Sequence, residues 1–184
     1  MEITSFDIEG PLLIKPRIFP DERGYFYESY NEPVFHKHGI TVKFVQDNQS
    51  GSLKNVLRGL HFQHPPFDQG KLVRVLTGRV ADVAVDIRKN SPTFGKHIKV
   101  ELSAENKHMF WIPPGFAHGF LSLEDDTIFL YKCTNVYDKN SESGILWNDA
   151  DLNIDWGTEN PLVSPKDLEL PSFRDLDSRF EYTK

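Results

Sequence analysis

The chain has 184 residues, which fits one domain, or one domain with a tail. Hydrophobic residues make up 39% of it and aromatic residues 12%, a composition typical of a folded globule rather than a disordered chain. The net charge is −6 and no long basic run occurs, which argues against binding to a nucleic-acid polymer, because such binding depends on neutralising phosphates.

The sequence also argues against a membrane or secreted protein. No apolar run approaches the length of a membrane span. The first ten residues carry Glu2, Asp7 and Glu9 and lack a basic region, so we expect no secretory signal. Cys133 is the only cysteine, so an intrachain disulfide is excluded and we expect a cytoplasmic location.

Short strands separated by turn residues are predicted along most of the chain. They cover residues 12–18, 24–30, 42–48, 56–63, 71–77, 79–87, 97–102, 108–112, 119–122 and 127–136. Gly and Pro signals such as Pro113-Pro114-Gly115 lie between them. Regular short strands with this punctuation predict an all-β sandwich or barrel.

Two short helices are expected besides the strands. Residues 31–39 predict one that ends at Gly39. The tail, residues 161–184, begins differently, because Ser164 resembles an N-cap, with Pro165 at the first helical position and Asp167 three residues on. We therefore expect a short C-terminal helix that packs on the barrel.

Alternation along the strands predicts which side chains share a face. In residues 79–87, Ala81, Val83, Val85 and Ile87 lie on one face, with Asp82 and Asp86 on the other. In residues 127–136, the shared face carries Phe129, Tyr131 and Cys133. Residues 56–63 place Arg58 opposite His61, so both can serve one pocket only if a bulge shifts the phase, and Gly59 is the natural place for it.

One motif points to a cupin barrel but not to the metal that cupins often hold. Residues 113–118 match the P-x-G-x-x-H pattern of the second cupin motif, which ends here at His118. The first cupin motif usually supplies H-x-H, whereas this chain has His61-Phe62-Gln63. A metal site needs several neutral imidazoles converging on one point, so we expect no bound metal.

A wider set of strings carries a more specific resemblance. They lie in order at residues 21–28, 44–48, 56–63, 70–74, 82–86, 116–120 and 131–134. From about residue 6 to residue 167 the chain resembles the dTDP-4-dehydrorhamnose 3,5-epimerase family. The resemblance implies one double-stranded β-helix domain (a cupin or jelly-roll barrel) over residues 1–184, no cofactor, and a homodimer whose N-terminal strands are exchanged between partners.

The resemblance also implies the roles of individual residues. His61 corresponds to the base, Asp167 to the carboxylate that orients it, Tyr131 to the acid and Lys71 to the lysine near the keto oxygen. Contacts with the nucleotide and sugar are implied for Arg23, Phe26, Glu28, Gln46, Asp47, Asn48, Arg58, Lys71, His118, Glu142 and Lys166. Phe26, Tyr137 and Trp147 are alternative stacking partners for thymine.

These residue types suit the implied reaction, which inverts carbons 3 and 5 of dTDP-4-dehydro-6-deoxy-D-glucose. The ketone at carbon 4 acidifies both C–H bonds, so a base and an acid on opposite sides of the ring suffice. Imidazole titrates near neutral pH, and a carboxylate on its other nitrogen fixes the tautomer. A preorganised ammonium can stabilise the enolate oxygen.

Structural alternatives accompany each of these functional interpretations. Taken singly, His61 could be a core histidine, Tyr131 a barrel-filling aromatic, Lys71 a solvated strand residue and Asp167 a helix cap. Other functions also stay open. They are inversion of only one centre of a related sugar nucleotide, a metal-dependent cupin oxygenase, and a non-catalytic sugar-nucleotide binding module.

Overall fold

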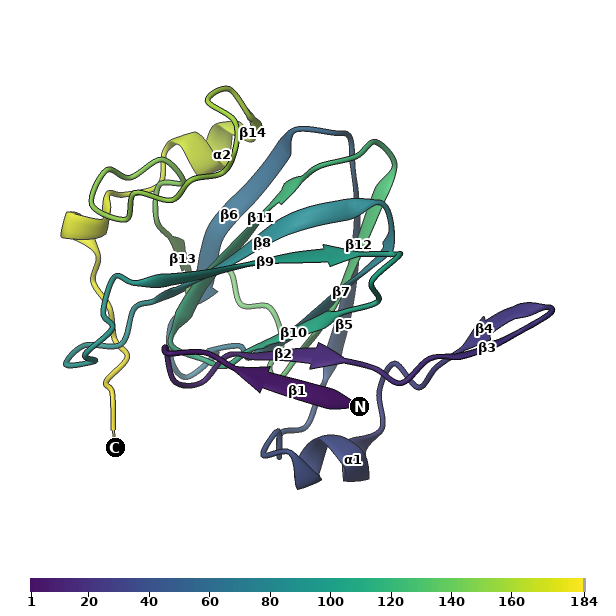
Figure 1. Ribbon diagram of the computed structural model, residues 1–184. Coiled ribbons are helices and arrows are strands. Elements are labelled where there is room, and N and C mark those ends of the chain that lie inside the picture. Colours follow the sequence, from purple (N-terminus) through teal and green to yellow (C-terminus); the bar gives the residue numbers. More distant parts are fainter. Residues whose placement is uncertain (184) are drawn as a thin grey trace.

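Two β-sheets face each other and form a barrel in the computed structural model, which describes residues 1–183 (Figure 1). The first sheet has the order β1-β2-β10-β7-β12-β5. Its strands are β1 (Glu2–Ser5), β2 (Leu12–Lys15), β10 (Met109–Ile112), β7 (Lys71–Thr77), β12 (Thr127–Cys133) and β5 (Gln46–Ser52). All of its neighbouring strands are antiparallel.

The second sheet has the order β13-β6-β11-β8-β9, with β14 parallel to β6. Its strands are β13 (Glu142–Gly144), β6 (Val56–Gln63), β11 (Phe116–Ser122), β8 (Arg79–Asp86), β9 (His97–Ser103) and β14 (Leu162–Val163). The prediction of an all-β cupin-type barrel is therefore confirmed. None of the described helices is long and apolar enough to cross a membrane.

Strand β8 of the second sheet is buried on both faces, and its two faces pack against different clusters. Val80 and Ala84 face the barrel interior, where they pack with Phe110 and Phe129 of the first sheet. Ala81, Val83, Val85 and Ile87 lie in a separate cluster with residues of the C-terminal segment, among them Ile145, Leu152, Trp156 and Phe180. Asp82 is fully buried as well, although it lies opposite the apolar face that the sequence predicts.

A β-bulge at Gly59 produces the predicted change of phase in β6. On the neighbouring β11, His118 pairs with His61 and Phe120 with Arg58. Gly59 and Leu60 of β6 therefore lie opposite the single residue Gly119. Gly59 has a φ of +129°, and a Cβ placed there would lie 2.5 Å from the Cα of Gly119. Only glycine fits this backbone, and the bulge lets Arg58 and His61 line the same cavity.

Both expected helices are present. Helix α1 (Glu32–Lys37) begins at Asn31, whose side chain accepts from the N–H of Val34, and ends before Gly39 with a φ of +86°. Helix α2 (Pro165–Leu168) begins at Ser164, which accepts from the N–H of Asp167, and it packs against β6. A 3₁₀ turn, η1 (Phe173–Asp175), follows it.

Several predicted strands have different bounds. Residues 12–18 form only β2, which ends at Lys15, and β11 begins at Phe116 rather than at residue 119. Residues 24–30 form only β4 (Gly24–Phe26), which pairs with β3 (Phe19–Asp21) in a hairpin that projects from the barrel (Figure 1). Residues 42–45 lie outside β5, and β12 ends at Cys133 rather than at residue 136. Four strands have no counterpart among the predicted ones, namely β1, β3, β13 and β14.

Candidate active site

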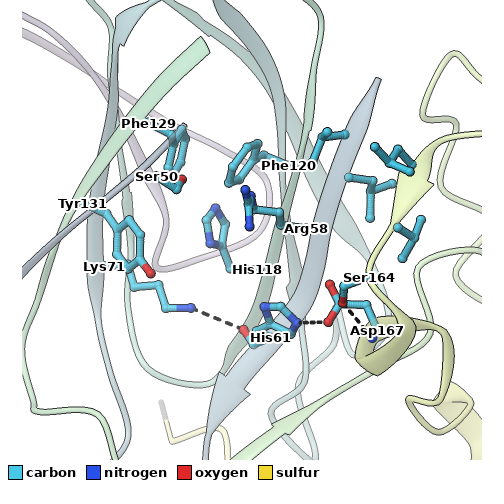
Figure 2. A pocket seen from close by; sticks show the side chains of 14 residues that line it. Ser50, Arg58, His61, Lys71, His118, Phe120, Phe129, Tyr131, Ser164 and Asp167 are labelled. Carbon is cyan, nitrogen blue, oxygen red and sulfur yellow. Dashed lines mark hydrogen bonds and ion pairs between the residues drawn. The ribbon is translucent and has the colours of Figure 1, made fainter. Parts of the chain in front are cut away.

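A cavity of about 580 Å³ opens between the two sheets (Figure 2). Both sheets contribute polar side chains to it, and Phe120 and Phe129 supply apolar surface at one end. The residues that line it are Ser50, Val56, Leu57, Arg58, His61, Lys71, His118, Phe120, Phe129, Tyr131, Leu162, Val163, Ser164 and Asp167. This lining holds all four residues to which the sequence assigns a role in proton transfer or enolate stabilisation.

His61 and Asp167 form a hydrogen-bonded pair on one side of the cavity. The Nε2 atom of His61 lies 2.8 Å from Oδ1 of Asp167. A carboxylate accepts only, so Nε2 carries the proton and the lone pair of Nδ1 remains for chemistry. The Nδ1 edge of the ring faces the cavity (Figure 2). His61 is 33% exposed, which leaves it accessible to a ligand.

The start of helix α2 fixes the Asp167 carboxylate. Its backbone N–H donates to the Ser164 hydroxyl at 3.1 Å, and its Oδ2 accepts from the N–H of Gly59 at 3.2 Å. Burial by itself raises the pKa of Asp167, but the hydrogen bonds from His61, Gly59 and Ser164 outweigh it and hold this pKa below its ordinary value. The carboxyl group is therefore ionised, as an orienting partner for imidazole must be.

Tyr131 and Lys71 come from the first sheet, and Tyr131 lies across the cavity from His61 (Figure 2). Their side chains point inward from the neighbouring strands β12 and β7. Burial raises the pKa of the Tyr131 phenol, which keeps it protonated at neutral pH. The Nζ of Lys71 donates to the backbone oxygen of His61 at 3.5 Å, and burial lowers the pKa of this lysine.

A second imidazole, that of His118, also lines the cavity (Figure 2). His118 is 7% exposed, and its Nε2 lies 2.9 Å and 3.0 Å from the two carboxylate oxygens of Asp82. Burial raises the pKa of Asp82, and burial lowers that of His118 against the opposing pull of the carboxylate. Asp82 is not among the predicted site residues. The sequence carries no clear signal for it, because alternation places Asp82 on the face opposite the apolar one and only the packing shows that both faces of β8 are buried.

Arg58 is the cation at the open end of the cavity. Its Nε donates to the Ser52 hydroxyl at 3.2 Å and its Nη2 donates to the carbonyl oxygen of Gly51 at 3.0 Å. These bonds fix the guanidinium and leave Nη1 available. Ser50, also not among the predicted site residues, lines the cavity with a buried hydroxyl that has no partner among the described residues.

A smaller cavity of about 130 Å³ continues past His61, Lys71 and Tyr131. Glu142 and Tyr137 also line it, and the Tyr137 hydroxyl donates to Oε2 of Glu142 at 2.8 Å. The same oxygen accepts from Nζ of Lys166 at 2.6 Å. Burial raises the pKa of Glu142, but the bonds from Lys166 and Tyr137 lower it by more, so Glu142 is ionised.

Alternation along β5 places the three predicted site residues at its start on two different faces of the strand. Gln46 and Asn48 point inward and line the smaller cavity, where the Gln46 amide donates to Oδ1 of Asn48 at 3.0 Å. Asp47 points outward and forms an ion pair with Lys132 at 3.0 Å. The expectation that all three residues serve one site is therefore corrected, because Asp47 lies on the opposite face of the strand.

The predicted residues of the N-terminal hairpin lie away from the cavity of their own chain (Figure 1). Arg23 pairs with Asp21 at 2.6 Å, and Glu28 accepts from the Asn31 amide at 2.9 Å. Phe26 is 66% exposed. Trp147, a third possible stacking partner for thymine, packs against the cluster behind β6 instead. Of the three candidates, Tyr137 lines a cavity next to His61, Lys71 and Tyr131.

The side chains that would bind a cupin metal have other partners. Nε2 of His61 and Nε2 of His118 face Asp167 and Asp82. The Gln63 amide donates to the carbonyl oxygens of Phe67 and Val136. Within residues 1–183, no group of three His, Cys, Asp or Glu side chains is arranged to hold a metal ion.

Comparison with known proteins gives one consistent result. The sequence profile of the dTDP-4-dehydrorhamnose 3,5-epimerase family matches residues 5–175. The chain is 54% identical over 178 residues to the enzyme of that name from Shigella flexneri, covering 96% of this chain and 98% of the relative. It is 56% identical over 173 residues to the one from Salmonella typhimurium, covering 93% and 94%.

A solved structure agrees with the sequence relatives. The crystal structure of dTDP-6-deoxy-D-glucose-3,5-epimerase from Legionella pneumophila Philadelphia 1, in complex with dTDP-4-keto-L-rhamnose, superposes with a TM-score of 0.95. The two chains are 48% identical, and the match covers 100% of this chain and 99% of the other.

Proposed function

The chain belongs to the dTDP-4-dehydrorhamnose 3,5-epimerase family, and from this premise we propose that it converts dTDP-4-dehydro-6-deoxy-D-glucose into dTDP-4-dehydro-L-rhamnose. It is an isomerase that inverts carbons 3 and 5 of the sugar. One observation carries the mechanism: His61 and Tyr131 line opposite sides of one cavity, with the Lys71 ammonium between them (Figure 2). A ring held between the first two groups can lose a proton from one face and gain one on the other.

His61 is the base. Its Nδ1 takes the proton from the carbon next to the ketone, and the C–H electron pair forms the enolate. Asp167 keeps the proton on Nε2 before the step and stabilises the imidazolium that forms during it. A positioned base of this kind contributes about 10²–10⁴ in rate.

Lys71 stabilises the enolate. The charge develops on the oxygen of carbon 4, and a preorganised donor in a site shielded from water interacts with that charge more strongly than water does. The burial that lowers the pKa of Lys71 also lowers the local dielectric. His118, held by Asp82, offers a second polar contact to the same face of the sugar.

Tyr131 is the acid. It delivers its phenolic proton to the ring face opposite His61, and solvent then restores the starting protonation of both groups. Because burial raises the pKa of this phenol, the proton is present at neutral pH when the enolate forms. The nearby cations Lys71 and Arg58 stabilise the phenolate that remains.

The polar groups at the cavity mouth suit the nucleotide. The guanidinium of Arg58 matches phosphate oxygens in shape and charge, and it lies at the rim of a protein with a net charge of −6. Lys166, which pairs with Glu142 of the smaller cavity, adds a second exposed cation. These local charges offset the acidic background around a dianionic diphosphate.

The working enzyme in this proposal is a homodimer in which each hairpin, β3–β4, completes the site of the partner subunit. One observation and one general principle support it. Arg23 and Phe26 are exposed on a hairpin that extends away from its own barrel. An isolated two-stranded ribbon is only marginally stable, so this hairpin needs a surface to pack against.

No cofactor takes part in the proposed chemistry, because proton abstraction and return leave the oxidation state of the sugar unchanged. The cytoplasm is the proposed compartment, on the basis of a single cysteine, Cys133, which is buried and unpaired.

The test is the identity of the product. Purified protein is incubated with dTDP-4-dehydro-6-deoxy-D-glucose, the keto-sugars are reduced with borohydride, and the released 6-deoxyhexoses are identified. Inversion of both centres predicts rhamnose and 6-deoxytalose. Finding 6-deoxyallose without rhamnose would show that only carbon 3 is inverted, which is the alternative function.

A complementation experiment tests the shared site. Arg23→Ala and His61→Ala proteins, each poorly active, are mixed, unfolded mildly and reassembled. If the hairpin serves the partner, each mixed dimer holds one intact site and about a quarter of wild-type activity returns. If the hairpin serves its own chain, no intact site forms and activity stays at the level of the parents.

A further inference from the structure

Gln63 occupies the place of the second histidine in the H-x-H pattern and forms a three-way link between loops. It lies at the end of β6 and is 5% exposed. Its Nε2 donates to the carbonyl oxygen of Phe67 and, at 3.1 Å, to that of Val136. Its Oε1 accepts from the N–H of Asp138 at 2.9 Å.

Two of these bonds hold the peptide groups on either side of Tyr137. The Val136 carbonyl and the Tyr137 N–H belong to one peptide group. Gln63 binds its oxygen, and Oε1 of Gln46 accepts from its N–H at 2.9 Å. The Asp138 N–H belongs to the next peptide group, and Gln63 binds it too. Both peptide planes that set the backbone angles of Tyr137 are therefore fixed by side-chain amides.

The side chain that this backbone carries is exposed. Tyr137 is 54% exposed, and it lines the cavity that continues from His61, Lys71 and Tyr131. Its hydroxyl is held by Glu142, so backbone and ring tip are both anchored while the ring surface is free. Buried polar groups thus hold an aromatic ring whose exposed surface packs against little of this chain.

We propose that Gln63 is a positioning residue that pre-orders Tyr137 as an aromatic wall of the nucleotide-sugar site. The inference rests on the proposed function, since it takes the ligand of the cavity to be the sugar nucleotide. Ordering the ring before binding removes an entropy cost that would otherwise weaken the complex. Gln63 acts on affinity in this role and has no part in proton transfer.

The chemistry of the amide explains why Gln63 stands where cupins often place histidine. The three bonds need two N–H donors and one acceptor on a single side chain. A primary amide offers both, whereas a neutral imidazole has one donor and one acceptor. The residue therefore suits the loop contacts that it makes.

A double-mutant cycle tests the inference. Gln63→Met keeps the length of the side chain but removes its three hydrogen bonds, and Tyr137→Ala removes the ring. We expect Gln63→Met to raise KM, and the Kd for dTDP measured by calorimetry, by about tenfold with kcat nearly unchanged. In the Tyr137→Ala background the same change should raise neither constant by more than about twofold. Gln49→Met, on the exposed outer face of β5, is the matched control and should behave as wild type.

The alternatives give different patterns. Independent, multiplying effects in the double variant, or a loss confined to kcat, would overturn the inference. So would a Tyr137→Ala protein with unchanged KM and Kd. If Gln63→Met does not fold, Gln63→Glu replaces it in the same cycle, since it keeps the acceptor for Asp138 and loses both donors. If the wild-type protein binds dTDP without turning over the sugar, the proposed function fails, while the Kd cycle still decides the role of Gln63.

Discussion

Replacing Asp167 by asparagine should disable the base without disturbing the cavity. The two carboxylate oxygens have separate donors, Nε2 of His61 at 2.8 Å and the N–H of Gly59 at 3.2 Å. An asparagine amide has one oxygen and one NH₂ group, so it cannot accept from both. If its oxygen faces His61, the NH₂ group opposes the Gly59 N–H. If its oxygen faces Gly59, the NH₂ group donates to His61.

The energies decide between these two arrangements. The first leaves a buried backbone donor without a partner, which costs about 1–3 kcal/mol. The second satisfies every group but moves the imidazole proton from Nε2 to Nδ1, the atom that must accept the substrate proton. The second arrangement therefore dominates, and the base is in the wrong tautomer. We expect kcat to fall by about 10²–10⁴, the contribution of a positioned base, with KM within about threefold of wild type.

The assay follows deuterium exchange at carbons 3 and 5 of the keto-sugar nucleotide by NMR. The control is Asp151→Asn, the same change of residue type at an exposed carboxylate that pairs with Arg174. It should leave the rate of deuterium exchange unchanged. An Asp167→Asn enzyme that exchanges protons within about threefold of the wild-type rate would refute the tautomer argument.

Three further predictions follow from the same contacts. Tyr131→Phe should slow epimerisation by about 10²–10⁴ but slow deuterium exchange into the sugar by less, because His61 can still remove and return a proton on its own face. Equal losses in both assays would contradict the assignment of Tyr131 as the acid. Lys71→Met should lower kcat by about 10²–10³ through loss of enolate stabilisation, and a change seen only in KM would oppose it. The folded-state pKa of Asp167 lies below its unfolded value, so its ionised form stabilises the protein above about pH 4, and this stability is lost as the pH falls further. The difference in unfolding free energy between wild type and Asp167→Asn should therefore become smaller below about pH 4. Urea titrations that show a constant difference would rule this out.

The bounds of a strand could be predicted from the sequence where the alternation of side chains and the positions of Gly residues agreed. Strands β6 and β7 have the predicted bounds, and the bulge at Gly59 follows from the need to bring Arg58 and His61 to one pocket. β12 ends at Cys133, and beyond it the Val136 carbonyl bonds to the Gln63 amide. Strands β13 and β14 have three and two residues, too few for any alternation to show.

The sequence identified most of the residues in the site, but it did not show for each of them which face of its strand lines the cavity. Alternation along β5 separates Asp47 from Gln46 and Asn48, so the sequence contained the signal that turns Asp47 away from the cavity. Asp82 was harder to identify, since alternation alone places it on the face opposite the apolar one. Only tertiary packing shows that the C-terminal segment covers the apolar face and that the face with Asp82 lines the barrel interior.

The most direct test of proton transfer between opposite faces is an exchange experiment in deuterated water with wild-type and His61→Asn proteins. We expect wild type to place deuterium on carbons 3 and 5 of the inverted sugar and His61→Asn to place it on neither. Inversion that retains the original protium at both carbons, or normal exchange by His61→Asn, would contradict it.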